Sequence, residues 1–159
     1  AAKCRENSIV QVTDPEEKSS ISRKILEALP DWFGICEARE EYIRHSREQL
    51  FFAAFREECP IGFLCLKETG KETAELAVMG VLKEHHRRGT GRKLFSAAKR
   101  CAIEKGYRFI QVKTVQMGRY DIYDDTNRFY QSLGFQEFEV FPYLWGEENP
   151  CQIYVMSVR

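Results

Sequence analysis

Residues 81–94, with the sequence VLKEHHRRGTGRKL, combine two glycines with a cluster of cations where a strand passes into a helix. Gly89 and Gly91 let the backbone approach a ligand closely, and the first amides of a helix have no intrahelical partners. The helix dipole adds about half a positive charge at the same place. This turn is therefore predicted to bind a pyrophosphate. The cations around it are Arg87, Arg88, Arg92 and Lys93.

Two other phosphate-binding motifs do not match this turn. A P-loop needs a Gly-Lys-Ser/Thr ending, whereas the chain has Gly91 followed by Arg92 and Lys93. A dinucleotide fingerprint needs a third glycine where the chain has Leu94, and it usually opens the first βαβ unit of a domain. A turn that only joins strand to helix would not explain the cations.

The elements that must position this turn follow from hydrophobic periodicity and turn residues. A cap, a first-position proline and an acid in Asp14-Pro15-Glu16-Glu17 start the first helix, which Pro30 is expected to stop. Further helices are predicted over about 36–48, from the turn to Gly106, and over 124–133. Strands are predicted at residues 8–12, 50–56, 61–67, 74–82, 109–115, 135–141 and 152–158. The order strand, helix, strand around the turn suggests a parallel pair.

Length and composition fit one soluble globular domain over residues 1–159. The chain is 43% hydrophobic and 30% charged, and no run approaches the roughly 18 apolar residues of a membrane span. Lys plus Arg equals Asp plus Glu at 24 each, which disfavours a dedicated nucleic-acid binder. The N-terminal residues show no secretory signal, so a cytoplasmic location is expected.

The six cysteines show neither a CxxC pair nor a histidine at metal-ligand spacing, so no metal site is expected. They are interpreted as buried free thiols. The cysteines are Cys4, Cys36, Cys59, Cys65, Cys101 and Cys151.

The turn resembles motif A of the GNAT superfamily of N-acetyltransferases, in which Gln or Arg, two residues, Gly, one residue, then Gly or Ala hold coenzyme A. Residues 129–135, FYQSLGF, resemble the family's FYxxLGF ending. The chain is thus similar to a bacterial-type single-domain member over roughly residues 50–140. One departure is His86, where Gln or Arg is usual.

The resemblance implies an α/β (α+β) fold with a mixed, mostly antiparallel sheet of about seven strands, a splayed central parallel pair and four flanking helices. It also implies that acetyl-CoA is the donor. Backbone groups of Val81 and Leu82 would pair with the pantetheine arm, and a bulge at Gly80 would free these groups from the sheet. The resemblance also suggests that Asn127 contacts the coenzyme, and the alternative is that Asn127 is an exposed polar residue of its helix. The implied coenzyme contacts are Val81, Leu82, His86, Arg87, Arg88, Gly89, Thr90, Gly91, Arg92 and Asn127.

Transfer of an acetyl group to an amine needs a base for the ammonium and an acid for the leaving thiolate. Glu75, fourteen residues before Gly89, is the candidate base by resemblance, with an exposed strand-start carboxylate or a water relay as alternatives. Tyr130 is the candidate acid by resemblance, with a core aromatic of an amphipathic helix as the alternative. Phe129 and Leu133 are expected to fill the buried stripe of that helix and to leave Tyr130 on another face.

The predicted function is direct ternary-complex N-acetylation of a primary amine, small molecule or peptide. A non-catalytic acyl-CoA sensor is the alternative, and an RNA-associated module rests only on the arginines. Neither a nucleic-acid nor a membrane partner is expected, and a homodimer stays open. Trp32, Phe33, Tyr120 and Trp145 are candidates for the acceptor side, with satellite core positions as the alternative.

Overall fold

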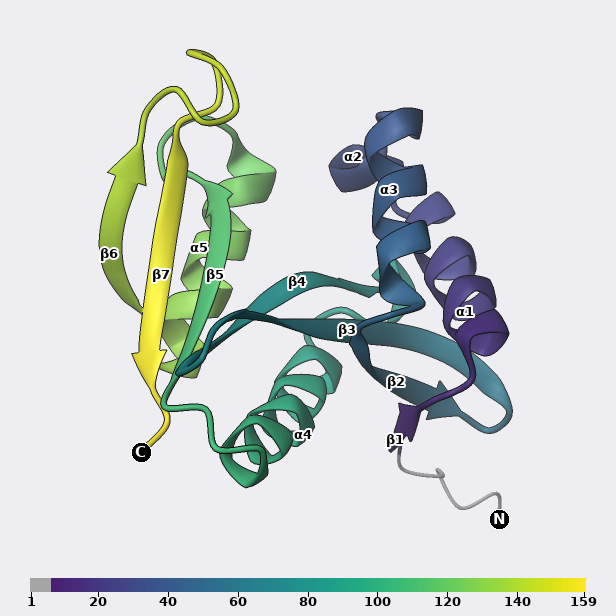
Figure 1. The fold of residues 1–159 in the computed structure, drawn as a ribbon. Helices are drawn as coiled ribbons and strands as arrows, with labels where there is room; N and C mark the ends of the chain where they lie inside the picture. The colour runs from purple at the N-terminus through teal and green to yellow at the C-terminus, as the bar shows by residue number, and fades with distance from the viewer. Residues whose placement is uncertain (1–6) are drawn as a thin grey trace. The chain divides into compact units, whose positions relative to one another are not determined.

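The computed structural model describes residues 7–159, whose strands form one seven-stranded mixed sheet in the order β1-β2-β3-β4-β5-β7-β6 (Figure 1). The strands are β1 (Ser8–Val12), β2 (Leu50–Arg56), β3 (Cys59–Gly70), β4 (Thr73–Val81), β5 (Phe109–Val115), β6 (Gln136–Phe141) and β7 (Cys151–Ser157). The helices are α1 (Pro15–Glu27), α2 (Pro30–Phe33), α3 (Cys36–Ser46), α4 (Thr90–Glu104) and α5 (Asp121–Leu133), with a 3-10 turn η1 (Lys83–His85). The predicted parallel pair is β4 with β5. The predicted fold class is confirmed.

The described chain divides into two compact units. The first unit holds the residues up to 67 and residues 77–101, and the second holds residues 68–76 and 102–159. Each unit is described separately below. The single domain predicted from chain length stays a prediction.

The first helix begins as its sequence predicts and ends at Glu27, before Pro30, as was also predicted. The Asp14 side chain accepts a hydrogen bond from the Glu17 amide at 3.3 Å, with Pro15 in the first turn. However, Pro30 starts α2 rather than only stopping α1, because proline suits the first position of a helix as well as a break. The structure therefore has five α-helices where four were expected.

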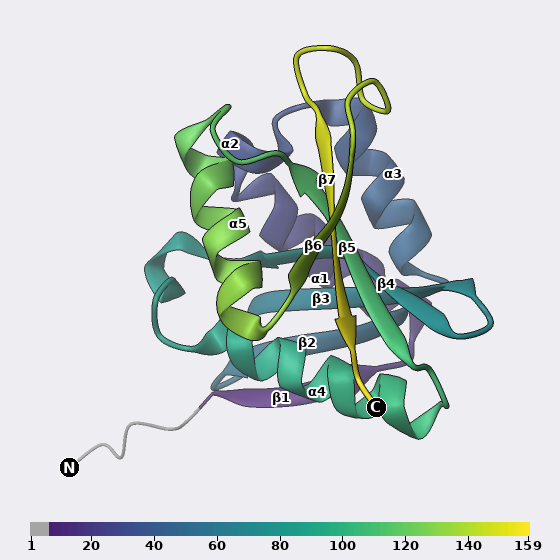
Figure 2. The same cartoon turned by 90° about the vertical axis from the view of Figure 1, so that its left-hand side faces the viewer.

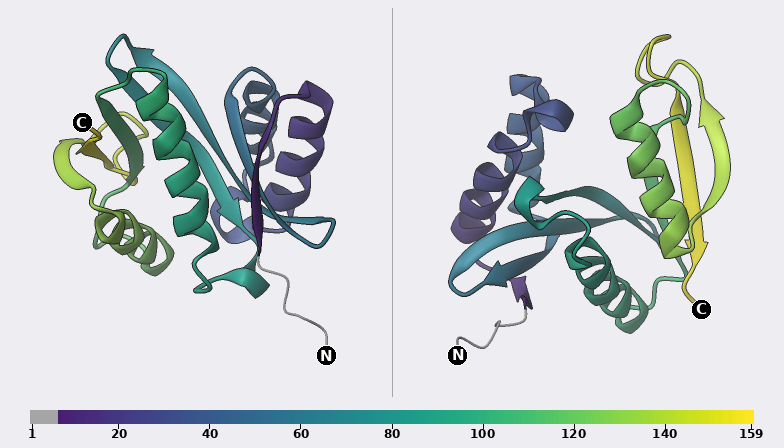
Figure 3. Two further views of the ribbon diagram at one scale, coloured as in Figure 1. Left: turned by 90° about the horizontal axis from the view of Figure 1, so that it is seen from below. Right: turned by 180° about the vertical axis from the view of Figure 1, so that it is seen from behind.

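The core of the first unit lies between α1, α3 and the strands β2 and β3. Ile25 and Leu26 of α1 are fully buried, as are Phe51 and Phe63, whose rings stack at 5.2 Å. Figure 3 shows α1 and α3 side by side. Burial of each such side chain contributes about 1.5–3 kcal/mol.

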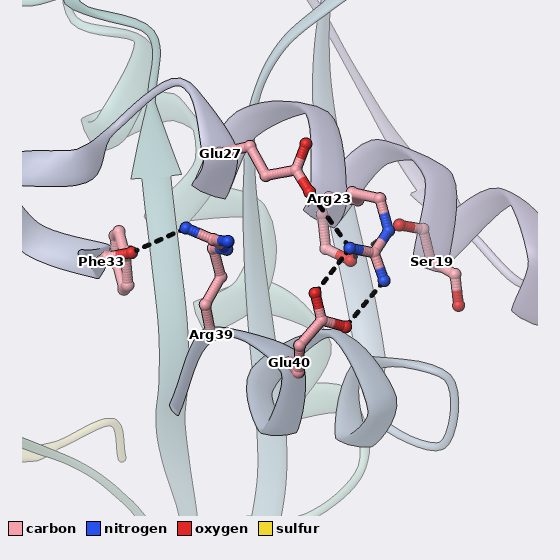
Figure 4. A network of polar contacts seen from close by, with 7 residues as sticks. Ser19, Arg23, Glu27, Phe33, Arg39 and Glu40 are labelled. Carbon is pink, nitrogen blue, oxygen red and sulfur yellow. Dashed lines mark hydrogen bonds and ion pairs between the residues drawn. The ribbon is translucent and has the colours of Figure 1, made fainter. Parts of the chain in front are cut away.

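Charged residues on the exposed surface link α1 to α3 (Figure 4). Nη1 and Nη2 of Arg23 donate to the carboxylate of Glu40, at 2.6 and 2.8 Å, and Nη1 also donates to Glu27 at 3.1 Å. All three side chains are more than 40% exposed, so water screens these pairs and they contribute little to stability. These contacts align two helices that the core already holds.

Gly80 of β4 has a packing role that the sequence did not predict. A Cβ at this position would lie 3.0 Å from Ile25 Cγ2 and 3.0 Å from Leu29 Cδ1, and both side chains are buried. Glycine is thus explained by the close approach of α1 to β4, and the bulge predicted at Gly80 stays a prediction.

We expect Gly80→Ala to lower the free energy of unfolding by about 1–3 kcal/mol, because the added methyl overpacks a filled contact. Urea denaturation followed by circular dichroism measures this. Gly70→Ala, in the β3–β4 hairpin, is the matched control, since a Cβ there meets nothing within 4 Å. Equal stability of the two variants would contradict the packing role.

The second unit contains β5, β7 and β6 in that order, with α5 against β5 (Figure 2). Helix α5 ends as predicted at Gly134, whose φ of 105° is left-handed. Beyond it the Phe135 amide donates to the Tyr130 carbonyl at 3.2 Å, and the Phe135 ring is buried.

The cysteines only partly follow the prediction of buried thiols. Cys65 and Cys151 are buried, and burial raises the pKa of both thiols. Cys36 and Cys59 are exposed, because they begin a surface helix and a strand at a hairpin. Cys4 lies outside the described residues.

Candidate active site

In the first unit, the glycine-rich turn leaves β4 through η1 and enters α4 at Thr90. Arg87 and Gly89 adopt left-handed backbone conformations, with φ of 61° and 80°. The first turn of α4 closes with a hydrogen bond from the Lys93 amide to the Gly89 carbonyl at 3.0 Å, so the amides of Thr90 and Gly91 lie ahead of it. The turn therefore directs backbone amides outward from a helix start, as anion sites do.

The surroundings of this turn are open and electropositive. A Cβ at Gly89 would meet nothing within 4 Å, so its backbone is accessible from the side where a side chain would lie. The side chains of Arg87, Arg88, Arg92 and Lys93 are all exposed. By contrast, Thr90 is 1% exposed, and its hydroxyl accepts a hydrogen bond from the side-chain Nδ2 of Asn7 at 3.2 Å. Thr90 thus anchors the turn to the start of the described chain.

The strand end beside the turn differs from the prediction in one respect. The Leu82 amide donates to the Ile61 carbonyl of β3 at 2.8 Å, so it is not freed for pantetheine as expected. The Val81 carbonyl lies 2.6 Å from His86 Nε2. The interstrand bond persists because β3 extends far enough to pair with the residue after β4.

In the second unit, Glu75 lies where β4 and β5 pair. The parallel pairing joins Thr73–Glu75 to Phe109–Gln111. Glu75 is 5% exposed, and its Oε1 lies 3.1 Å from the Nζ of Lys113, which follows Gln111 by two residues on the same face of β5. The alternative of an exposed carboxylate at a strand start is therefore wrong. A buried carboxylate this close to an ammonium forms a charge-assisted contact.

Tyr130 belongs to the buried face of α5. It is 6% exposed, and its ring lies 5.9 Å from Phe135 and 6.3 Å from Tyr154. Phe129 and Leu133 are only half-buried, so the predicted apolar stripe is wrong. The helix turns by about 100° per residue, and the face that meets β5 and β7 is the one carrying Tyr130.

Asn127, one turn before Tyr130, is fully buried. Its Nδ2 donates to the carbonyls of Val115 and Tyr123 at 2.8 and 2.7 Å, and its Oδ1 accepts from the Tyr154 hydroxyl at 2.7 Å. The alternative of an exposed helix residue is thus wrong. Its contact with the coenzyme stays a prediction, and these bonds weigh against it because they engage both ends of the amide.

The aromatic residues proposed for the acceptor side fall into two groups. In the first unit, Trp32 and Phe33 are partly buried against the hydrophobic core, and the Trp32 ring lies 5.8 Å from that of His86. In the second unit, Tyr120 and Trp145 are each 44% exposed. The second pair is therefore the more exposed of the two.

Two residues of the second unit's site were missed in the sequence. Lys113 contacts the candidate base, and Tyr154 packs on the candidate acid and bonds Asn127. A lysine within the predicted strand FIQVKTV was a usable signal for the first. Tyr154 carried none, because an aromatic residue in a strand is ordinarily core.

Two further properties concern the described residues. Over residues 7–159, no helix combines the length and the apolar character that a membrane crossing would need. Within the same range, histidine, cysteine, aspartate and glutamate side chains form no group of three or more that could hold a metal ion.

Comparison with known proteins identifies the family. A family model for the acetyltransferase (GNAT) domain matches residues 47–137, more than half of the chain. The chain belongs to the GNAT acetyltransferase family. A sequence search of curated proteins finds no match.

Solved structures of this family share the fold along nearly the whole chain. A Desulfovibrio desulfuricans protein described as a GNAT-family acetyltransferase has a TM-score of 0.79 at 20% identity, over 97% of this chain and 100% of that one. The IAA acetyltransferase of Bacillus cereus has 0.74 at 19%, over 96% and 99%. An aminoglycoside 6'-N-acetyltransferase in complex with coenzyme A has 0.73 at 19%, over 98% of each chain. At these identities the likeness concerns the fold.

Proposed function

We propose that this protein is an acetyl-CoA-dependent N-acetyltransferase that acts on a primary amine by direct transfer in a ternary complex. The observation that carries the proposal is the turn at 86–91, where a left-handed glycine and a helix start fit a pyrophosphate. Its spacing is that of the family's coenzyme motif. Coenzyme A complexes among similar structures support the choice of donor.

In this mechanism the turn holds the donor by its phosphates, while Arg88 and Arg92 add charge at the rim. The Val81 strand end would orient the pantetheine arm. When bound, acetyl-CoA supplies the acetyl thioester. Glu75, directly or through a water relay, would accept a proton from the acceptor ammonium. Tyr130 would donate a proton to the leaving thiolate and would be reprotonated by the proton that the amine nitrogen loses as the amide forms. No covalent intermediate is required.

We expect Gly89→Ala to weaken acetyl-CoA binding by roughly tenfold, because a Cβ disfavours the left-handed φ of 80° and alters the aim of the amides. Isothermal titration calorimetry measures the dissociation constant. Gly118→Ala is the matched control: its φ of 94° carries the same backbone penalty in a loop of the second unit, with open space around it. Equal affinity in the two variants would remove the turn from the cofactor site.

An acetyl-CoA-coupled screen of amine classes tests the reaction itself. Thiol release that depends on both acetyl-CoA and an amine would support the enzyme. Tight acetyl-CoA binding with no turnover on antibiotics, polyamines, amino acids, peptides or protein lysines would favour the alternative, an acyl-CoA sensor. Glu75 and Tyr130 favour the enzyme, since a sensor needs neither an acid nor a base.

A further inference from the structure

His86 stands where the family motif usually has Gln or Arg, and in this structure its side chain is turned to the protein. Its Nε2 lies 2.6 Å from the Val81 carbonyl oxygen. Since a carbonyl can only accept, Nε2 carries the proton, which holds for one neutral tautomer and for the imidazolium. The contact therefore needs no particular charge on the ring.

The His86 ring also contacts the ring of Trp32 in α2. The two rings meet edge to face, with centroids 5.8 Å apart and an interplanar angle of 71°. His86 is thus the shared neighbour of a strand end proposed for the cofactor and an aromatic residue proposed for the acceptor.

Trp32 also contacts the cation Lys83. Lys83 Nζ lies 5.7 Å from the centroid of the Trp32 ring and 2.7 Å from Asp31 Oδ2. Lys83 precedes His86 on the same turn, so two side chains of this turn contact residues of α2. A side chain extended to a distant phosphate would not make these contacts.

We propose that His86 is a positioning residue that fixes the Val81 carbonyl and the Trp32 ring, in place of contacting the cofactor phosphates. The inference rests on the proposed function. It assigns to His86 an effect on the pantetheine arm and on the acceptor side, while the backbone amides and exposed arginines of the turn bind the phosphates.

The decisive experiment compares two probes that differ in the pantetheine arm. Coenzyme A carries both the nucleotide and the arm, whereas 3'-phosphoadenosine 5'-diphosphate carries only the nucleotide and its phosphates. We expect His86→Ala to weaken coenzyme A binding roughly fivefold, as loss of one positioning hydrogen bond would, and to leave affinity for the nucleotide unchanged. Calorimetry on the full chain measures both.

His86→Gln provides the conservative control, because a glutamine amide can donate to the Val81 carbonyl. It should restore most of the coenzyme A affinity. His86 is exposed, so neither substitution opens the core, and circular dichroism checks the fold. An equal loss of affinity for both probes would show a phosphate contact and overturn the inference, as would unchanged affinity for both.

Trp32 offers a readout that does not depend on affinity. The chain has two tryptophans, so Trp145→Phe leaves Trp32 as the sole indole emitter. In that background, saturating coenzyme A should change the Trp32 emission, and His86→Ala should abolish most of the change. If coenzyme A changes the Trp32 emission equally with His86 and with His86→Ala, the proposed coupling of His86 to Trp32 is overturned.

Failure of the inference can be told from failure of the proposed function. If the unaltered protein binds coenzyme A but His86→Ala gives either overturning pattern, only the inference falls. If the unaltered protein does not bind coenzyme A at all, the proposed function falls and the inference falls with it.

Discussion

Tyr130→Phe is expected to lower turnover by an order of magnitude or more while the dissociation constant for acetyl-CoA barely changes. A phenol can protonate a leaving thiolate, because in water the pKa of a phenol lies only about 1.5 units above that of a thiol. Loss of such an acid typically costs 10²–10⁴-fold, and solvent can replace part of it. Steady-state kinetics with the amine found by the screen measures the effect.

The control for this variant is Tyr154→Phe. The Tyr154 ring lies 6.3 Å from that of Tyr130, and its hydroxyl bonds Asn127. Burial raises the pKa of Tyr154, with Glu137 acting in the same direction. Loss of the Tyr154 hydroxyl should lower the free energy of unfolding by about 1 kcal/mol and should change turnover little. Unchanged turnover in Tyr130→Phe would remove Tyr130 from the mechanism.

Lys113→Met is expected to lower the free energy of unfolding by about 2 kcal/mol or more, because it takes a cation from a buried carboxylate. Glu75 is 7% exposed in its side chain and Lys113 is 34% exposed, so water screens the lysine only in part. Chemical denaturation of the unaltered protein and of Lys113→Met under the same conditions measures the change in the free energy of unfolding.

The double variant Lys113→Met/Glu75→Gln separates the charge from the packing. It removes both charges, so it should recover much of the lost stability. Arg128→Met is the control for a surface pair, since Arg128 and Asp125 are each more than 60% exposed, and it should change stability by less than about 1 kcal/mol. Equal losses in Lys113→Met and Arg128→Met would contradict a buried ion pair.

This ion pair also affects how Glu75 can act. One oxygen of the carboxylate already meets the Lys113 ammonium, so an acceptor ammonium would share the group with a fixed cation. Retained activity in Glu75→Gln would favour the water relay over direct proton abstraction. A loss of turnover with normal acetyl-CoA affinity would favour Glu75 as base.

Much of the fold was predictable because local signals agreed with the packing that followed. The cap at Asp14, the left-handed Gly134 and the apolar runs of β2 and β5 each act within a few residues, and the structure confirms them. The first helix ends before Pro30 as predicted, but the start of α2 at Pro30 was not predicted, because proline can both stop one helix and start another.

The sequence by itself indicated the family and the glycine-rich turn, and it predicted the donor, since glycine spacing and cations are local properties of residues 81–94. The tertiary structure alone decided what each side chain meets. It buried Tyr130 and Asn127 on one face of α5, paired Glu75 with Lys113, and turned His86 toward Val81. These contacts join residues from separate strands and helices, so their energies depend on packing that no local pattern records.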